Sequence, residues 1–258
     1  MSATVVMIPG ACCGAWCFDG LRQAFEARGH RVLTPELPYH DTAPGAEPDP
    51  RLAQCGLRDY ADAIARELDA LGAPPVLLGH SMGGLLAQLL AARGRASALM
   101  LLAPAAPWGI LPSTPDEIVG AMGLMATGDF WNRAIVPVFE VAAETSLNCL
   151  SSERQREVFP RFVPESGKAL FQSLFWMFDA EAASHVNAVN VTCPVLCVAG
   201  GRDRLTPPAT VAKIAEKYAA MATTEEFPEA GHMLLLEDGW PEIAACCLDW
   251  LDGALPTN

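Results

Sequence analysis

The sequence predicts an α/β fold in which a mostly parallel sheet carries helices on both faces. Short, often β-branched apolar runs alternate along the chain with longer segments that place apolar residues at helical spacing. The chain has 258 residues, of which 51% are hydrophobic and 18% charged, so it can bury a sizeable core. No repeat of fixed period and no low-complexity segment interrupts the pattern. We therefore expect one large α/β unit.

The first third of the chain begins with a buried strand. Residues 3–8 (ATVVMI) form an apolar run that stops at Pro9-Gly10. Helical spacing of apolar residues follows over 18–28, and a second strand is predicted near 31–34. Residues 57–71 place apolar side chains at helical spacing with charges between them, which is typical of an amphipathic helix.

The same alternation continues through the middle and the end of the chain. PVLLGHSMGGLLAQLLAARG predicts a strand, a tight turn and a helix that ends at Gly94, and ALMLLAP predicts the next strand. The last two strands are expected within 194–201 and 223–232, separated by a helix around 208–220. A closing helix spans roughly 240–252. Strands that alternate with helices in this way form parallel sheets.

Between the fourth strand and residue 191 the alternation stops. The stretch has helical patches and no convincing strand. It is rich in large aromatic residues, namely Trp108, Phe130, Trp131, Phe139, Phe171, Phe175, Trp176 and Phe178. Any one of these taken alone is better explained as core, but together they favour a helical cap inserted after the fourth strand, over the edge where open α/β sheets bind ligands. The predicted division is a core at 1–103 and 192–258 and a cap at 104–191.

Charge and cysteine content exclude several classes of function. The net charge of −13, from 17 basic and 30 acidic residues, argues against nucleic acid or an anionic membrane surface as a partner. No run of about 18 uncharged apolar residues occurs, so no membrane span is expected. The N-terminus lacks the pattern of a signal peptide, and cytoplasm is the default location. The nine cysteines show no ligand spacing, which favours buried free thiols and no metal site.

The strongest chemical signal is the run Gly79-His80-Ser81-Met82-Gly83, a G-x-S-x-G pattern between a predicted strand and a predicted helix. A serine on such a sharp turn holds its Oγ out of the sheet, within reach of a base and a substrate. The flanking glycines let the strand and the helix approach without clashes of β-carbons. Ser81 is therefore the candidate nucleophile.

Serine needs a general base at neutral pH, and the chain offers five histidines. His80 adjoins the nucleophile and faces away from it in this kind of turn. His30 opens a strand and His40 lies in a loop. His232 follows the last strand, where a loop can return it to the carboxyl edge of the sheet. We therefore predict His232 as the base.

An acid usually fixes the tautomer of a catalytic histidine and stabilises its charged form. Asp203 directly follows the penultimate strand, at the same edge of the sheet. The order Ser81, Asp203, His232 is the order expected for a nucleophile of this type. Asp203 could instead simply cap its loop, and the neighbouring Arg202 and Arg204 are expected to be solvated or structural.

A tetrahedral intermediate also needs oxyanion donors. One is expected from the backbone N–H of Met82, the residue after the nucleophile. The second is expected from the loop after the first strand, residues 9–16, with the N–H of Ala11 as the candidate. Gly10 keeps the backbone accessible there.

The motifs PGACCGAW, GHSMGG, GGRDRLTP and AGHM, in this order, resemble the α/β-hydrolase superfamily across essentially the whole chain. The GACxGxW loop is similar to one branch, the methylesterases of plant hormone esters and their hydroxynitrile-lyase relatives. The family usually has histidine where this chain has Pro9, and often a second histidine at Cys13. The backbone donors survive both changes, but the hydrogen bonds that brace the loop are expected to differ.

The same resemblance bears on reaction type. Lyases of that branch carry a threonine in the oxyanion loop and a lysine after the catalytic histidine, whereas this chain has Gly10 and Met233. The resemblance therefore implies the esterase side. Residues expected to contact substrate are Gly10, Cys12, Trp108, Phe130, Trp131, Trp176 and Met233.

The leading hypothesis is a serine hydrolase that cleaves a small, largely apolar carboxylic ester through an acyl-enzyme. It needs no cofactor and no metal, and its partner is a small-molecule substrate. The same three residues also serve hydrolysis of a carbon–carbon bond, a lactone or an amide, and a ligand receptor of this fold is a further alternative. A monomer or a homodimer fits the sequence equally well.

Overall fold

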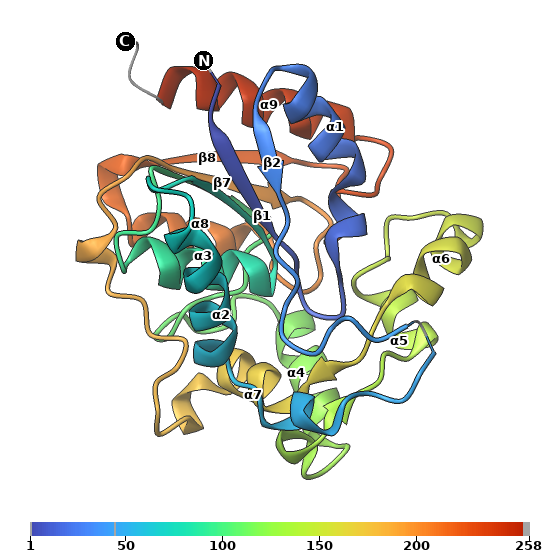
Figure 1. Cartoon of the computed structure of the whole chain (residues 1–258). Helices are drawn as coiled ribbons and strands as arrows, with labels where there is room; N and C mark the ends of the chain where they lie inside the picture. The colour runs from blue at the N-terminus through green and yellow to red at the C-terminus, as the bar shows by residue number, and fades with distance from the viewer. Residues whose placement is uncertain (1, 44, 255–258) are drawn as a thin grey trace.

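The computed structural model describes residues 2–43 and 45–254, and its centre is a six-stranded parallel sheet (Figure 1). The strand order is β2-β1-β3-β4-β7-β8, and every neighbouring pair is parallel. The strands are β1 (Thr4–Ile8), β2 (Arg31–Leu33), β3 (Val76–His80), β4 (Ala98–Leu102), β7 (Val195–Gly200) and β8 (Ala222–Phe227). The predicted α/β class with a mostly parallel sheet is confirmed.

Helices cover both faces of the sheet, as the sequence predicts (Figure 1). One face carries α1 (Asp19–Ala27) and α9 (Trp240–Ala254). The other carries α2 (Leu57–Asp69), α3 (Met82–Ala91) and α8 (Pro208–Glu216). Alternate residues of each central strand enter opposite layers of core, which is why the strands are continuous apolar runs.

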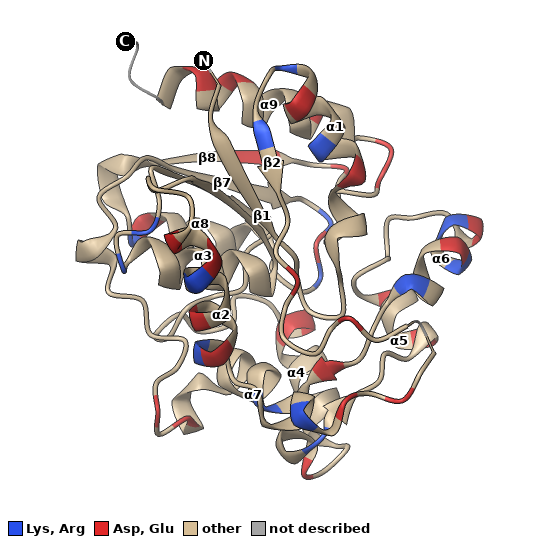
Figure 2. Ribbon diagram, viewed as in Figure 1, with Lys and Arg blue, Asp and Glu red and all other residues tan. Residues whose placement is uncertain are grey.

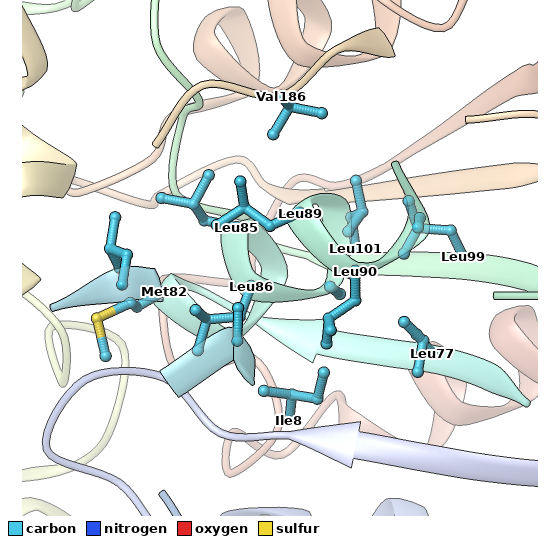
Figure 3. Packing of buried hydrophobic residues seen from close by; sticks show 14 of the residues in the cluster. Ile8, Leu77, Met82, Leu85, Leu86, Leu89, Leu90, Leu99, Leu101 and Val186 are labelled. Carbon is cyan, nitrogen blue, oxygen red and sulfur yellow. The ribbon is translucent and has the colours of Figure 1, made fainter. Parts of the chain in front are cut away.

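Helix α3 holds the centre of one of these layers (Figure 3). All ten of its residues are buried. Its leucines, among them Leu85, Leu86 and Leu90, pack with Ile8 of β1 and Leu77 of β3 in one cluster. Full burial of each such side chain is worth about 1.5–3 kcal/mol, so the turn that precedes α3 rests on a rigid support.

The segment between β4 and β7 forms the cap beyond the carboxyl ends of the strands (Figure 1). Its helices are α4 (Pro115–Met125), α5 (Phe139–Glu144), α6 (Ser152–Val158) and α7 (Gly167–Leu174). Contrary to the sequence prediction, it also contains two strands, β5 (Ala134–Ile135) and β6 (Glu165–Ser166), which pair antiparallel. Two residues per strand are too few to show an alternating pattern.

Short 3-10 helices link these elements. They are η1 (Ala15–Phe18), η2 (Pro50–Gln54), η3 (Phe130–Asn132), η4 (Phe159–Arg161), η5 (Trp176–Phe178), η6 (Ala188–Asn190) and η7 (Ala219–Met221).

Lys and Arg are scattered over several elements in the view of Figure 2, often beside Asp or Glu. None of the helices in the described ranges combines the length and the apolar character needed to cross a membrane.

Candidate active site

Ser81 lies on the turn between β3 and α3 in a strained backbone conformation, with φ 50° and ψ −122°. The glycines around it are required by close approach. A β-carbon at Gly79 would collide with the carbonyl of Gly83, and one at Gly83 would collide with the carbonyl of Ile8. The G-x-S-x-G pattern therefore encodes a turn in which β3, α3 and the end of β1 touch backbone to backbone.

The structure brings the three predicted residues Ser81, His232 and Asp203 together at the carboxyl edge of the sheet. Nε2 of His232 lies 2.9 Å from Oγ of Ser81. Nδ1 of His232 lies 2.9 Å from Oδ2 of Asp203. The side chains of Asp203 and His232 are both buried. Because the carboxylate accepts the Nδ1 proton, Nε2 is free to accept the hydroxyl proton of the serine.

Asp203 is held as a carboxylate by several donors. Its Oδ1 accepts the backbone N–H of Leu205 at 2.7 Å and of Thr206 at 2.9 Å. The hydroxyl of Thr206 lies 2.9 Å from Oδ2. Burial alone would raise the pKa of Asp203, but His232 and these donors hold it below its usual value. Thr206 was missed in the sequence, although an Asp followed three residues later by Thr is a recognisable turn pattern.

His80 contacts the backbone of the loop that carries His232 and not the side chains of Ser81 or Asp203. Its Nε2 lies 2.9 Å from the carbonyl oxygen of His232, and the two rings are 5.0 Å apart. Burial, followed by the neighbouring His232, lowers the pKa of His80 to about 3. The ring is therefore neutral and donates its Nε2–H to that carbonyl, which fixes the position of residue 232.

Ala11 and Met82, the predicted oxyanion donors, line the same cavity as Ser81. Neither backbone N–H has a hydrogen-bond acceptor among the residues that the structure describes. Met82 is the first residue of α3, so its N–H also lies at the positive end of a helix dipole. This arrangement suits an oxyanion beside the serine.

The cavity has a volume of about 250 Å³ and is bounded by the loop after β4, by α4 and by α7. Most of its lining is apolar, and its polar residues besides Ser81 are Glu117, Thr145, Ser173, Thr206 and Thr210. The carboxylate of Glu117 accepts from the N–H groups of Ser113 and Thr114 and from the Thr210 hydroxyl. Both carboxylate oxygens of Glu117 thus already accept hydrogen bonds from within the protein.

The predicted aromatic contacts need correction. Trp176 lines the cavity. Phe130 is fully buried among Trp131, Phe171 and Phe175, and Trp131 is 37% exposed on the outside. Trp108 packs on Trp176 and is 40% exposed. Periodicity shows that a side chain is apolar but not whether it faces the cavity or the interior of the cap.

Three further contacts predicted with substrate also fall outside the described lining of the cavity. Met233 is 1% exposed and packs in the apolar layer beneath α1 and α9. Gly10 lies against Ser81, where a β-carbon on residue 10 would be 3.0 Å from the β-carbon of Ser81. Cys12 turns toward the cap, and burial raises the pKa of its thiol well above the usual value. Cys12 is half-buried and Cys13 is buried.

Comparisons with known proteins identify the family of this chain. A model of the alpha/beta hydrolase family matches residues 5–245. Methylesterase 9 of Arabidopsis thaliana is 33% identical over 88 residues, which is 33% of this chain and 33% of that protein. The pimeloyl-[acyl-carrier protein] methyl ester esterase of Neisseria meningitidis is 30% identical over 185 residues, 69% of this chain and 66% of that protein. The chain thus spans about a third and just under two thirds of these relatives.

A solved structure has the same fold over nearly all of the chain. The methylesterase MES16 from Arabidopsis superposes with a TM-score of 0.72 at 16% identity, covering 97% of this chain and 99% of that one. The resemblance to the esterase branch, predicted from the motifs, is confirmed by the relatives. The chain belongs to the alpha/beta hydrolase family.

Proposed function

We propose that this protein hydrolyses a small, largely apolar carboxylic ester with Ser81 as nucleophile, His232 as general base and Asp203 as its orienting acid. The observation that carries the proposal is the continuous hydrogen-bonded path from Asp203 to Ser81, which opens into an apolar cavity. The names of the relatives, a methylesterase and a methyl ester esterase, support an ester as the substrate class.

The proposed reaction has two halves. His232 takes the proton of Ser81 as Oγ attacks the ester carbonyl, and the oxyanion is stabilised by the N–H groups of Ala11 and Met82. One such donor is worth about 2.7–4 kcal/mol. His232 then protonates the leaving alkoxide, which leaves an acyl group on Ser81. Water activated by the same imidazole releases the acid.

The cavity also supports a limit on substrate charge and size. Its volume of about 250 Å³ is small for a ligand site. Its described lining contains no lysine or arginine, while it does contain the carboxylate of Glu117. A substrate that carries its own carboxylate or phosphate would be repelled without a compensating cation. We therefore expect uncharged esters to be preferred.

The assignment of Ser81 is tested by Ser81→Ala, with Ser184→Ala as a matched control. Ser184 is a buried serine outside the cavity lining. Ser81→Ala should abolish hydrolysis of p-nitrophenyl esters with an unchanged circular dichroism spectrum, whereas Ser184→Ala should remain active. A fluorophosphonate should label wild type at Ser81, as read by peptide mass spectrometry. More than a few per cent residual turnover in Ser81→Ala would overturn the assignment.

Lactone, amide and carbon–carbon bond hydrolysis use the same three residues, and assaying such substrates beside the p-nitrophenyl esters separates them. Cyanohydrin cleavage is disfavoured, because this chain has Gly10 and Met233 at the positions where the lyases that it resembles carry a threonine and a lysine. Purified protein should release no cyanide from mandelonitrile above the buffer rate. Cyanide release without esterase activity would reverse the choice of reaction.

A further inference from the structure

A buried ionisable cluster lies behind the oxyanion loop, outside the reaction path described above. Glu165 of β6 is 0% exposed and contacts two residues distant in sequence. Its Oε2 lies 3.1 Å from Nε2 of His40, whose side chain is also buried. Its Oε1 accepts the hydroxyl proton of Tyr60 in α2 at 2.7 Å and the backbone N–H of Ser166 at 2.7 Å.

The contacts of His40 show that the cluster is an ion pair. Nδ1 of His40 faces the carbonyl oxygen of Pro38 at 3.0 Å, and Nε2 faces the carboxylate of Glu165. Both ring nitrogens therefore face acceptors and both carry protons. Although burial opposes charge on each group, their contact raises the pKa of His40 and lowers that of Glu165.

The same carboxylate reaches the oxyanion loop. The backbone N–H of Cys12 donates to Oε2 of Glu165 at 3.3 Å, and the carbonyl of Cys12 accepts the N–H of Val163 at 3.0 Å. Cys12 has φ 63°, a left-handed conformation that is strained for a residue with a β-carbon. Nearby, the guanidinium of Arg161 lies 4.5 Å from the ring centre of Trp16. The cap segment 161–165 thus contacts the peptide groups on both sides of Cys12 and the ring of Trp16. Together these contacts form a clamp on the oxyanion loop.

A buried ion pair contributes little net stability by itself, because desolvation offsets the attraction. The position of this ion pair explains its presence better, since Cys12 adjoins Ala11. Ala11 lines the cavity, and its N–H has no acceptor in residues 2–43 and 45–254. We propose that Glu165 is a positioning residue, in which a carboxylate fixed by His40 and Tyr60 holds Cys12 so that the N–H of Ala11 points at the oxyanion. The inference rests on the proposed function, and it makes the cap a part of the oxyanion hole.

Glu165→Gln tests this positioning role. It removes the charge while keeping the size, so the clamp on Cys12 weakens. We expect kcat for p-nitrophenyl acetate to fall about 10-fold or more, toward the roughly 100- to 1000-fold loss seen when an oxyanion donor is removed, with KM within about twofold of wild type. Affinity for a boronic acid, which mimics the tetrahedral state, should fall in parallel with kcat.

Two tyrosine variants distinguish an effect on the position of the loop from the general effect of losing a buried hydrogen bond. They also test the proposal if Glu165→Gln fails to fold. Tyr60→Phe removes a partner of Glu165. Tyr218→Phe removes an equally buried hydroxyl, which bonds Gln88 at 2.7 Å away from the loop. Tyr60→Phe should lower kcat and boronate affinity, whereas Tyr218→Phe should lower only the melting temperature. Equal kcat in these two variants would overturn the proposal.

The rate of fluorophosphonate labelling separates this inference from the proposed ester substrate, because it needs no ester. If wild type is labelled at Ser81 but cleaves no ester, a slower rate in Glu165→Gln still supports the clamp, and an unchanged rate refutes it. If Ser81 is not labelled in wild type and Ser81→Ala leaves turnover intact, both the proposed function and the clamp are wrong.

Discussion

At the scale of single residues, Gly10 in the loop after β1 lies close to two side chains of the proposed site. A β-carbon there would lie 3.0 Å from both Cβ of Ser81 and Nδ1 of His80. His80 in turn contacts the carbonyl of His232, so a side chain at residue 10 would displace Ser81 and His232 together. The close approach explains why glycine suits this loop irrespective of backbone dihedral angles.

Gly10→Ala should therefore lower kcat/KM for small esters by about 10-fold or more, because displacements well under 1 Å misalign the reacting atoms. Gly10→Thr should lower it further. Gly253→Ala, where a β-carbon meets nothing within 4 Å, is the control and should leave kinetics unchanged. Steady-state kinetics with p-nitrophenyl acetate measure both, and wild-type kcat/KM in Gly10→Ala would contradict the packing argument.

At the scale of elements, β6 matters more than its two residues suggest. It brings Glu165 to His40 in the loop after β2 and to Tyr60 in α2, which ties cap and core together through one buried carboxylate. The contribution of the His40–Glu165 ion pair to stability depends on pH. The raised pKa of His40 means that its contribution is complete below its usual pKa of 6.5 and is lost as pH rises through the folded value. The lowered pKa of Glu165 means loss only as pH falls below its usual 4.5.

The difference in unfolding free energy between wild type and His40→Gln should accordingly be largest between about pH 4.5 and 6.5 and should shrink toward pH 9. Urea unfolding at several pH values measures it. His30 supplies the opposite case, since burial lowers its pKa and its nitrogen accepts the N–H of Ala3. The corresponding difference for His30→Gln should shrink as pH falls. A pH-independent difference for His40→Gln would refute the ion pair.

At the scale of the whole molecule, the three proposed catalytic residues and the cavity beside them come from different parts of the chain. Ser81, Asp203 and His232 follow β3, β7 and β8, whose carboxyl ends meet at one edge of the sheet. The cap covers that edge with α4 and α7 and supplies most of the cavity wall. Substrate preference should therefore change with the cap while the chemistry stays with the core.

Ala121→Phe on α4 tests this division, because Ala121 lines the cavity. The added ring should fill part of the volume of about 250 Å³ and lower kcat/KM for hexanoate esters about 10-fold relative to acetate esters. The rate of fluorophosphonate labelling with a small reagent should change little. Val119→Phe, on the same helix but 69% exposed, is the matched control. An unchanged chain-length profile in Ala121→Phe would place the acyl group elsewhere.

The sequence by itself determined the features that depend on local pattern and chain order. Alternating apolar runs and helical spacing predicted the parallel sheet, and glycines at 79 and 83 predicted the turn that carries Ser81. The positions of Asp203 and His232 after strands predicted that they meet Ser81, because carboxyl ends of parallel strands share one edge. These inferences need only near neighbours in sequence and the rules of parallel sheets.

Only the tertiary structure decided which cap residues face the cavity and which support the oxyanion loop. Phe130 and Trp176 are alike in sequence context, yet one is enclosed in the cap and the other lines the cavity. Glu165 meets Tyr60 and His40 across 105 and 125 residues. No periodic pattern marks such a contact, because a buried carboxylate is stabilised by partners that the fold supplies from distant elements.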